Sequence, residues 1–202
     1  MEHKDWDERY AGDELLWRAD PNRFLVAETE HLTPGRALDL ACGEGRNAVW
    51  LAEKGWEATG IDFSPVALAK ARCLAEERGV VVGWVEADVR EWEAPSSFDL
   101  VVVFYLHLLA NERRRAHHNA AHAVAVGGTL LIVGHDFANL AEGIGGPQDP
   151  ALLFTPADVL SDLAGLDVSF EFERAESVRR PVLANGGQVD AIDVLVRAMR
   201  KS

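Results

Sequence analysis

The sequence predicts an α/β fold: one doubly wound, mostly parallel sheet of seven strands that ends in an antiparallel hairpin. Three observations predict it. Short β-rich runs alternate with longer helical patterns through most of the chain. The run Val101-Val102-Val103-Phe104 is apolar on both faces, as a buried parallel strand should be. Near the end, two strand patterns follow each other without a helix, and Asn185-Gly186-Gly187 between them favours a hairpin.

The first elements alternate regularly. They are a strand at 36–40, a helix at 45–54, a strand at 57–62 and a helix at 65–78. Ser64 is a suitable N-cap for the second of these helices, because its hydroxyl can accept a bond from an unpaired backbone N–H of the first turn. Pro65 fits the first helical position, where its missing N–H costs nothing. Both helices therefore connect parallel strands.

The later elements continue the pattern and then change it. They are a strand at 80–86, a strand at 98–104, a helix at 110–126 stopped by Gly127-Gly128, a strand at 129–133, a helix at 155–164, and strands at 168–172 and 192–199. Thr155-Pro156-Ala157-Asp158 has the form of a capped helix start. The connection 135–154 is long for a compact domain, which is typical of a lid or a binding loop.

The charge and composition of the chain limit the partners and the cellular compartment that we expect for it. The chain has 202 residues, of which 33 are acidic and 20 are basic, so its formal net charge is −13. Such a surface repels phosphate backbones and anionic lipids, and we expect neither a nucleic-acid partner nor a membrane partner. Two cysteines indicate a reducing compartment, and no apolar run follows Met1. We therefore expect a cytoplasmic protein, whose oligomeric state the sequence leaves open.

A glycine-rich turn follows the first strand and opens a helix. Gly43 and Gly45 permit a tight turn and the close approach of a ligand to the backbone. Asp39 lies at the end of the strand, Asp62 ends the next strand 17 residues beyond Gly45, and Asp88 follows the third strand. Because ligands of open parallel sheets bind at the carboxyl ends of the strands, the three carboxylates point to one site.

Several ligands fit a turn of this kind. Gly43-x-Gly45-x-x-Ala48 passes a loose test for a dinucleotide fingerprint, so a nicotinamide-dependent oxidoreductase is one alternative. A non-catalytic nucleotide-binding sensor is another. Asp39 would repel a diphosphate and tolerate a cation, and no residues remain for a separate substrate domain. These two features favour a cationic ligand.

From Pro34 to Arg200 the chain resembles the class I S-adenosylmethionine-dependent methyltransferases. The resemblance implies a Rossmann-like methyltransferase fold and S-adenosyl-L-methionine as the cofactor. It implies that the segment from Asp39 to Gly45 cradles the methionine part, that Asp62 binds the ribose hydroxyls and that Asp88 contacts the adenine amine. Ala41 stands where the family usually has a glycine. The implied cofactor-binding residues are Asp39, Ala41, Gly43, Gly45, Asn47, Asp62, Phe63, Asp88, Val89 and Phe104.

A narrower resemblance concerns the acceptor side. The segment from Gly45 to Ala52 is similar to the Gly-Arg-Asn segment of tellurite-resistance and thiopurine methyltransferase-like proteins. Trp6 to Tyr10, with Trp17, is similar to the N-terminal segment that folds over cofactor and substrate in the latter group. Packing of an N-terminal helix on the sheet is the alternative for these aromatic residues. The candidate substrate residues are Trp6, Tyr10, Trp17 and Tyr105.

Histidines supply the candidate catalytic groups. His107 and His135 each follow a predicted strand at the carboxyl edge of the sheet, where a base would be useful. Asp136, next in the chain, either orients the His135 imidazole or points to solvent. The histidines at 117, 118 and 122 and the three arginines at 113–115 indicate a solvated helix face, and no metal site is expected.

The sequence thus predicts a single methyltransferase domain over 1–202 that acts on a small molecule through an S, N, O or chalcogen nucleophile. Within it, 1–33 is expected to form a helical cap, 34–134 the cofactor-binding half, and 135–202 the lid loop and the C-terminal strand pair. For Asp62 we expect that removal weakens cofactor binding and leaves the thermal midpoint of the ligand-free protein nearly unchanged.

Overall fold

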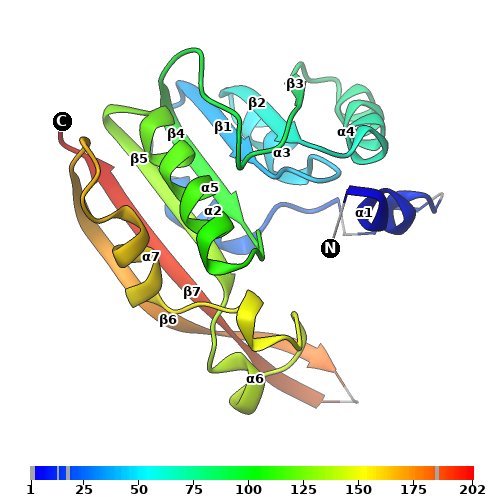
Figure 1. The fold of residues 1–202 in the computed structure, drawn as a ribbon. Helices are drawn as coiled ribbons and strands as arrows, with labels where there is room; N and C mark the ends of the chain where they lie inside the picture. The colour runs from blue at the N-terminus through cyan, green and yellow to red at the C-terminus, as the bar shows by residue number, and fades with distance from the viewer. Residues whose placement is uncertain (1–2, 13, 17–18, 185–186) are drawn as a thin grey trace.

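A computed structural model describes residues 3–12, 14–16, 19–184 and 187–202. Its centre is one seven-stranded sheet with the order β3-β2-β1-β4-β5-β7-β6 (Figure 1). The first five strands pair in parallel, and β7 pairs antiparallel with both β5 and β6. The predicted fold class, including the antiparallel strand pair at the end of the chain, is confirmed.

The elements have the following bounds. The strands are β1 Arg36–Leu40, β2 Glu57–Asp62, β3 Gly83–Glu86, β4 Phe98–Phe104, β5 Val124–His135, β6 Phe170–Ala184 and β7 Gly187–Arg200. The helices are α1 His3–Tyr10, α2 Arg23–Thr29, α3 Arg46–Glu53, α4 Pro65–Arg78, α5 Ala110–Ala123, α6 Asn139–Glu142, the 3₁₀ turn η1 Pro150–Leu152, and α7 Pro156–Leu163.

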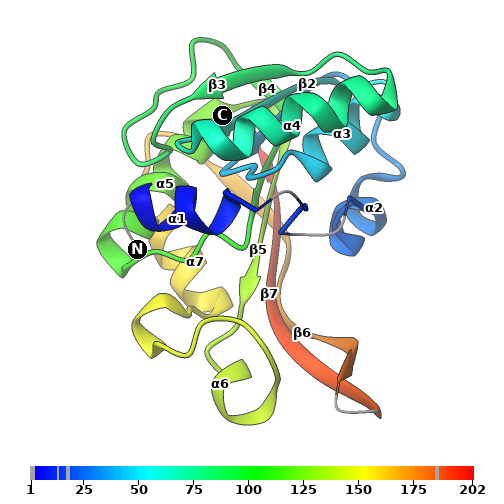
Figure 2. The same ribbon diagram turned by 90° about the vertical axis from the view of Figure 1, so that its right-hand side faces the viewer.

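Helices cover both faces of the sheet, and each face has its own apolar core (Figure 2). On one face, α5 and α7 pack over Val101 and Val103 of β4. On the other face, α2, α3 and α4 pack over Val102 of the same strand. Successive side chains of a strand point to opposite faces, so one apolar run supplies both cores. This explains why the sequence of β4 shows no alternation.

The predicted helix starts are correct in detail. The Ser64 hydroxyl accepts a 3.1 Å bond from the backbone N–H of Ala67. At α7, Thr155 and Asp158 form a reciprocal capping box, in which each side chain accepts a bond from the other residue's backbone N–H. These bonds fix where α4 and α7 begin.

The predicted boundary between the helix at 110–126 and the following strand is wrong. The helix ends at Ala123, and β5 begins at Val124, which pairs with Phe98. Gly127 and Gly128 lie inside the strand, where the register of β4 and β5 shifts. A Cβ on Gly128 would lie 2.9–3.0 Å from three carbonyl oxygens, so the glycine is required by close strand packing and not by the helix end.

Three other strands differ in length from their predicted bounds. The third strand begins at Gly83, opposite Thr59, and not at Val80. Both strands of the C-terminal hairpin are longer than predicted, and Ala184 pairs with Gly187 at their tip. Residues 185–186, where the hairpin turn was predicted, lie outside the described residues. The long hairpin extends beyond the end of β5 (Figure 1).

The connection 135–154 contains the helix α6 and the turn η1. The buried Asn139 side chain accepts a 2.7 Å bond from the backbone N–H of Ile192. Asp136, also buried, accepts bonds from the N–H of Ala138 and the hydroxyl of Ser177. The segment is thus fastened to β6 and β7, and its mobility without ligand stays a prediction. No helix in the described part of the chain is long and apolar enough to cross a membrane.

Candidate functional site

The turn between β1 and α3 has the backbone shape of a ligand-binding loop. Ala41, Gly43 and Gly45 all have positive φ, at 59°, 54° and 79°. A carboxylate oxygen of Asp62 accepts a 2.8 Å bond from the backbone N–H of Gly43, and the other accepts a 2.9 Å bond from that of Ser64. The end of β2 is therefore joined to the turn after β1, as expected for neighbouring parallel strands.

The two glycines of the turn are required for different reasons. A Cβ on Gly45 would lie 2.6 Å from the Trp84 ring and 2.7 Å from the Cβ of Ala71. Packing of the turn against β3 and α4 thus requires a glycine at 45, in addition to its positive φ. A Cβ on Gly43 would instead face the Tyr10 hydroxyl oxygen at 3.1 Å. Gly43 is the glycine whose open face points to the side covered by α1.

Asp39 is the most unusual ionisable group of this region. Its side chain is 1% exposed, and its Oδ2 has no hydrogen-bond partner among the described residues. Burial raises the pKa of Asp39 to about 7, and the negative charge of Asp62 adds to this effect. The charge of Arg46 and the N–H of Ala48 act in the opposite direction. The Asp39 carboxylate would therefore stabilise a positively charged hydrogen-bond donor placed beside it.

Asp88 lies after β3 and is held by a neighbour. The guanidinium of Arg90 donates to both carboxylate oxygens of Asp88 and also pairs with Glu112 of α5. Asp88 also accepts a 2.9 Å bond from the backbone N–H of Arg90. These bonds fix the loop that follows β3 against α5. A contact of Asp88 with an adenine amine stays a prediction.

The structure gives the burial and contacts of four other predicted cofactor residues, which the sequence motif does not show. Asn47 is buried, and its Oδ1 accepts a 2.9 Å bond from the backbone N–H of Asn22, just before α2. Val89 and Phe104 are buried in the two apolar cores. Phe63 follows Asp62 and is half-buried. The first three therefore support the shape of the crevice whether or not they touch a ligand.

The N-terminal helix covers the turn. Tyr10 is 5% exposed, and its ring stacks on Trp6 with centroids 5.6 Å apart. Asp7 accepts a 2.5 Å bond from the Ser64 hydroxyl, which joins α1 to the start of α4. Figure 2 shows α1 lying alongside α4. Trp17, another candidate substrate residue, lies outside the described residues.

The ends of β4 and β5 bring Tyr105, His107 and His135 together. The ring of His135 lies 5.0 Å from that of Tyr105 and 5.3 Å from that of His107, centroid to centroid. Tyr105 has a φ of 54°, a strained value for a residue with a bulky side chain. Its hydroxyl donates a 3.0 Å bond to Asp193. The three predicted residues thus share one site at the carboxyl edge of the sheet.

Sequence reasoning missed Asp193, which lies at the centre of this cluster. It is fully buried on β7, opposite His135 in the strand register. Arg180 of β6 donates to both of its oxygens, at 2.6 and 3.4 Å. The sequence does carry a signal, because Asp193 is the one charged residue within the apolar run 191–196 of a predicted strand. Asp136, which was weighed as the partner of His135, bonds to Ala138 and Ser177 instead.

The prediction of a solvated helix face at 113–122 is wrong for two residues. His117 is 1% exposed, and its Nδ1 lies 3.0 Å from the buried carboxylate of Asp162 on α7. Arg113 is also buried and donates a 2.7 Å bond to the same carboxylate. These groups join α5 to α7. Within the described residues, no cluster of three or more His, Cys, Asp and Glu side chains could hold a metal ion.

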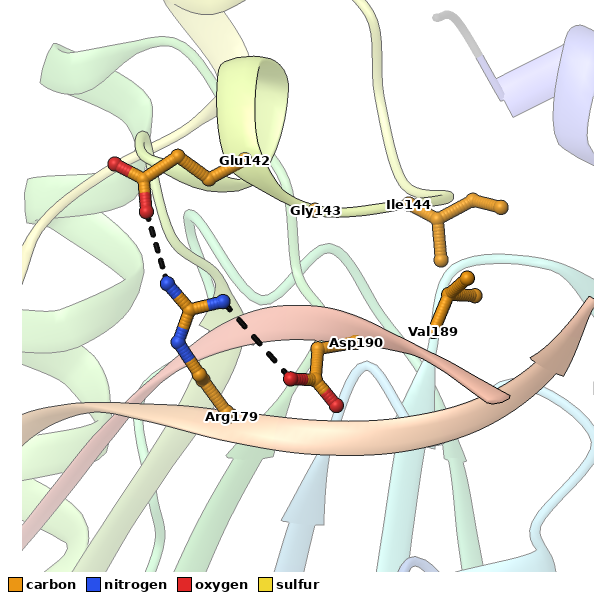
Figure 3. Close-up of a pocket in the computed structure, with 6 residues that line it drawn as sticks. All are labelled: Glu142, Gly143, Ile144, Arg179, Val189 and Asp190. Carbon is orange, nitrogen blue, oxygen red and sulfur yellow. Dashed lines mark hydrogen bonds and ion pairs between the residues drawn. The ribbon is translucent and has the colours of Figure 1, made fainter. Parts of the chain in front are cut away.

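One surface hollow lies away from these residues. Figure 3 shows it between the α6 segment and the hairpin, with a volume of about 370 Å³. Arg179 crosses it, 2.9 Å from Glu142 and 3.9 Å from Asp190. Because its charged groups are paired with one another, we assign this hollow a structural part in holding α6 to the hairpin. It contains none of the predicted site residues.

A family profile described as "Methyltransferase domain" matches residues 37–128. A demethylmenaquinone methyltransferase from Thermus thermophilus is 35% identical over 125 residues, which is 60% of this chain and 55% of that protein. A ubiquinone biosynthesis O-methyltransferase from Pseudomonas aeruginosa is 33% identical over 104 residues, 50% of this chain and 44% of that protein. The chain spans about half the length of these curated relatives.

Solved structures share the fold over nearly the whole chain. A structure described under the conversion of a disulfide bond into a thioacetal group during echinomycin biosynthesis has a TM-score of 0.79 and 24% identity, covering 98% of this chain and 91% of that chain. The N-methyltransferase NodS from Bradyrhizobium japonicum, in complex with S-adenosyl-L-homocysteine, has a TM-score of 0.72 and 20% identity, covering 98% and 97%. TehB from Haemophilus influenzae has a TM-score of 0.72 and 18% identity, covering 99% and 67%. Residues 37–128 therefore match a methyltransferase domain profile, and the chain has the fold of these methyltransferase structures, as the resemblance of its motifs implied.

Proposed function

We propose that this protein binds S-adenosyl-L-methionine over the turn between β1 and α3 and transfers its methyl group to a small molecule. The observation that carries the proposal is Asp39, a buried carboxylate with an oxygen that has no partner in the described structure. A buried acceptor without a donor is unfavourable by about 1–3 kcal/mol. The ammonium of the cofactor's methionine part supplies both the missing donor and the missing positive charge.

The other residues of the crevice fit the rest of this ligand. Asp62 accepts one backbone bond on each oxygen, and a carboxylate at the end of β2 is the type of group that accepts bonds from ribose hydroxyls. Because Gly43 has no side chain, its backbone can lie directly against a ligand held between the turn and Tyr10. The cofactor supplies an activated methyl group when bound, and the protein supplies position and exclusion of water. Tyr10 and Trp6 of α1 form the cover.

The acceptor side lies at the ends of β4 and β5. His107, His135 and Tyr105 line it, and the α6 segment closes over it, because a Cβ on Gly146 would lie 2.5 Å from the His135 ring. One curated relative is named a demethylmenaquinone methyltransferase and another a ubiquinone biosynthesis O-methyltransferase. A ring-lined site fits a small molecule better than a polymer. The formal charge of −13 also disfavours nucleic acid.

Isothermal titration calorimetry tests the proposal. We expect S-adenosylmethionine and S-adenosylhomocysteine to bind the parent protein, and the oxidised nicotinamide dinucleotide not to bind. Asp39→Asn should weaken both ligands at least about tenfold, the loss of a charge-assisted bond. Asp162→Asn is the matched control, since Asp162 is equally buried but lies between α5 and α7. Binding of the nicotinamide dinucleotide alone would favour the oxidoreductase alternative.

Turnover separates an enzyme from a sensor. Transfer of labelled methyl groups from the cofactor to a mixture of small phenols, thiols and amines should exceed the spontaneous rate in the parent protein. Binding of the cofactor without transfer to any of the three classes would favour the non-catalytic sensor.

A further inference from the structure

Asp193 lies at the centre of a network of polar side chains from several strands. Its Oδ2 accepts bonds from the Tyr105 hydroxyl at 3.0 Å and from Arg180 Nε at 2.6 Å, and His135 Nδ1 lies 3.1 Å from its Oδ1. These residues come from β6, from β7 and from the ends of β4 and β5. A fully buried carboxylate with three side-chain partners fixes the position of each of them. The group fixed closest to the predicted acceptor side is His135.

Asp193 determines which ring nitrogen of His135 carries the proton. Burial would raise the pKa of Asp193, but the neighbouring His135 and the hydrogen bonds and positive charge of Arg180 outweigh it and lower that pKa below its ordinary value. The carboxylate is therefore ionised and attracts a proton on Nδ1. Nδ1 and Oδ1 are 3.1 Å apart, which is an ion-pair distance, and in this structure their angle lies outside hydrogen-bond geometry. In neutral His135 this leaves Nε2 as a bare acceptor.

His107 has the same arrangement through a different partner. Its Nδ1 lies 3.1 Å from the carbonyl oxygen of Leu152, which can only accept, so Nδ1 carries the proton. Burial lowers the pKa of His107 to about 4, so the ring is neutral at physiological pH. Its Nε2 is buried and has no hydrogen-bond partner within the described chain. His107 and the neutral form of His135 thus each offer an unprotonated Nε2, on rings whose planes are inclined by 14°.

We propose that Asp193 is a positioning residue that holds His135 as the general base for a hydroxyl-bearing aromatic acceptor. This inference rests on the methyltransferase function proposed above and names the acceptor chemistry of the same site. The rings of Tyr105, His107 and Phe154 favour a flat acceptor. Two bare nitrogen lone pairs favour an acceptor that brings a proton to donate. A deprotonated oxyanion or thiolate has no such proton, and its lone pairs would repel those of both imidazoles.

In the proposed step, the acceptor hydroxyl loses its proton as its oxygen gains the methyl group. The proton of the acceptor hydroxyl moves to Nε2 of His135, and the oxygen keeps the electron pair of the broken O–H bond. That pair forms the new bond to the methyl carbon, and the electrons of the carbon–sulfur bond pass to sulfur, which becomes neutral. The imidazolium of His135 is stabilised by the Asp193 carboxylate and then loses its Nε2 proton to water.

Within the described chain, His135 contacts the titratable groups of Asp193, Tyr105 and His107. Asp193 of β7 is ionised, and Arg180 of β6 neutralises its charge. Tyr105 and His107, after β4, are both neutral near pH 7, since burial raises the pKa of the first and lowers that of the second. From the α6 segment, the backbone of Gly146 contacts the ring.

Nitrogen-15 NMR of the histidine rings tests the assignment without any turnover. In the protein saturated with S-adenosylhomocysteine, we expect His135 and His107 to carry their protons on Nδ1 near neutral pH. Asp193→Asn should raise the Nε2–H population of His135, because the amide can donate to Nδ1, and leave His107 unchanged. Asp190→Asn, a change at a half-buried carboxylate on the same strand that pairs with Arg179, should alter neither ring. An Nε2–H tautomer of His135 in the parent protein would overturn the proposal.

The ionisation of a bound chromogenic phenol gives a second readout. We expect 4-nitrophenol, added to the protein saturated with S-adenosylhomocysteine, to show its phenolate absorption below the pH at which it ionises in solution. This shift should vanish in His135→Gln, and kcat for methylation of the same phenol should fall by ~10²–10⁴-fold with little change in KM. An unchanged kcat in that variant would overturn the proposal, as would a phenol that stays protonated when bound. Failure of S-adenosylhomocysteine to bind at all would instead refute the proposed function.

Discussion

Oδ2 of Asp62 accepts a 2.8 Å hydrogen bond from the backbone N–H of Gly43, so the end of β2 holds the turn that follows β1. Oδ1 of the same carboxylate accepts a bond from the N–H of Ser64, the N-cap of α4. A residue that the sequence marks only as a ligand contact is therefore also part of the fold. This double part changes what its removal should do.

Asp62→Ala should lower both stability and cofactor affinity. The change leaves two N–H groups without their acceptor, which we expect to cost about 2–4 kcal/mol, seen as a lower midpoint in thermal unfolding of the ligand-free protein. The sequence alone led us to expect a nearly unchanged midpoint. We now expect a lower one, because the structure shows two backbone hydrogen bonds to Asp62. Asp136→Ala is the matched control, because Asp136 is another buried carboxylate that accepts a backbone bond. It should lower stability similarly and leave calorimetric affinity intact.

Asp39 should make stability depend on pH. Its folded-state pKa of about 7 lies above its ordinary value of 3.8, so the folded protein binds more protons than the unfolded chain between these values. Stability should therefore fall as the pH rises from about 4 to about 7 and then level off. In denaturant unfolding at several pH values, Asp39→Asn should remove this part of the dependence. A parallel pH dependence in parent and variant would contradict the assignment.

Ala41→Gly should stabilise the ligand-free protein. Ala41 has a φ of 59°, a conformation that is about 1–2 kcal/mol less favourable for a residue with a Cβ. The greater freedom of glycine in the unfolded chain offsets ~0.5–1 kcal/mol of this gain. A net rise of up to about 1 kcal/mol in the free energy of unfolding is expected. A fall would mean that the Ala41 methyl group makes a contact worth more than the strain.

Gly45→Ala should mainly lower stability, whereas Gly43→Ala should mainly lower cofactor affinity. At 45 the new Cβ meets Trp84 and Ala71 within 2.7 Å, so we expect a loss of stability above about 2 kcal/mol. At 43 it meets only the end of the Tyr10 side chain at 3.1 Å, which can move. That variant should lose less stability and more cofactor affinity. Equal stability losses with equal affinities would contradict the separation of a packing glycine from a ligand glycine.

Hydrogen exchange tests the lid. The segment around α6 is held by Asn139 and Asp136, so we expect residues 136–142 to exchange slowly with or without ligand. Residues 143–149, which contain Gly143, Gly145 and Gly146, should exchange faster and become protected by S-adenosylhomocysteine. If residues 143–149 were equally protected from exchange with and without S-adenosylhomocysteine, the interpretation of this segment as a lid would be wrong.

The sequence predicts the strands that alternate with helices and the capped helix starts, because apolar periodicity and hydroxyl caps are local signals. It predicts the end of α5 wrongly, since the start of β5 at Val124 depends on pairing with Phe98. The burial of His117 and Arg113 depends on Asp162, which lies more than forty residues away in the chain. Such long-range pairs leave no local pattern.

The candidate site divides in the same way. The glycine turn and its carboxylates form a spaced motif that single-sequence reading can find. The partner of His135 comes from β7, and only the antiparallel register of β5 and β7 brings Asp193 opposite it. Reading along the chain favours the adjacent Asp136, whose side chain is in fact used to hold the α6 segment.

Calorimetric titration of the ligand-free protein with S-adenosylmethionine, at pH 6 in two buffers of different ionisation enthalpy, tests the central claim most directly. We predict binding, accompanied by release of a proton that Asp39 must lose to meet a positive charge, and neither tight binding nor proton release in Asp39→Asn. Absence of binding in the parent protein, or binding equally tight and equally linked to proton release in the variant, would contradict the account.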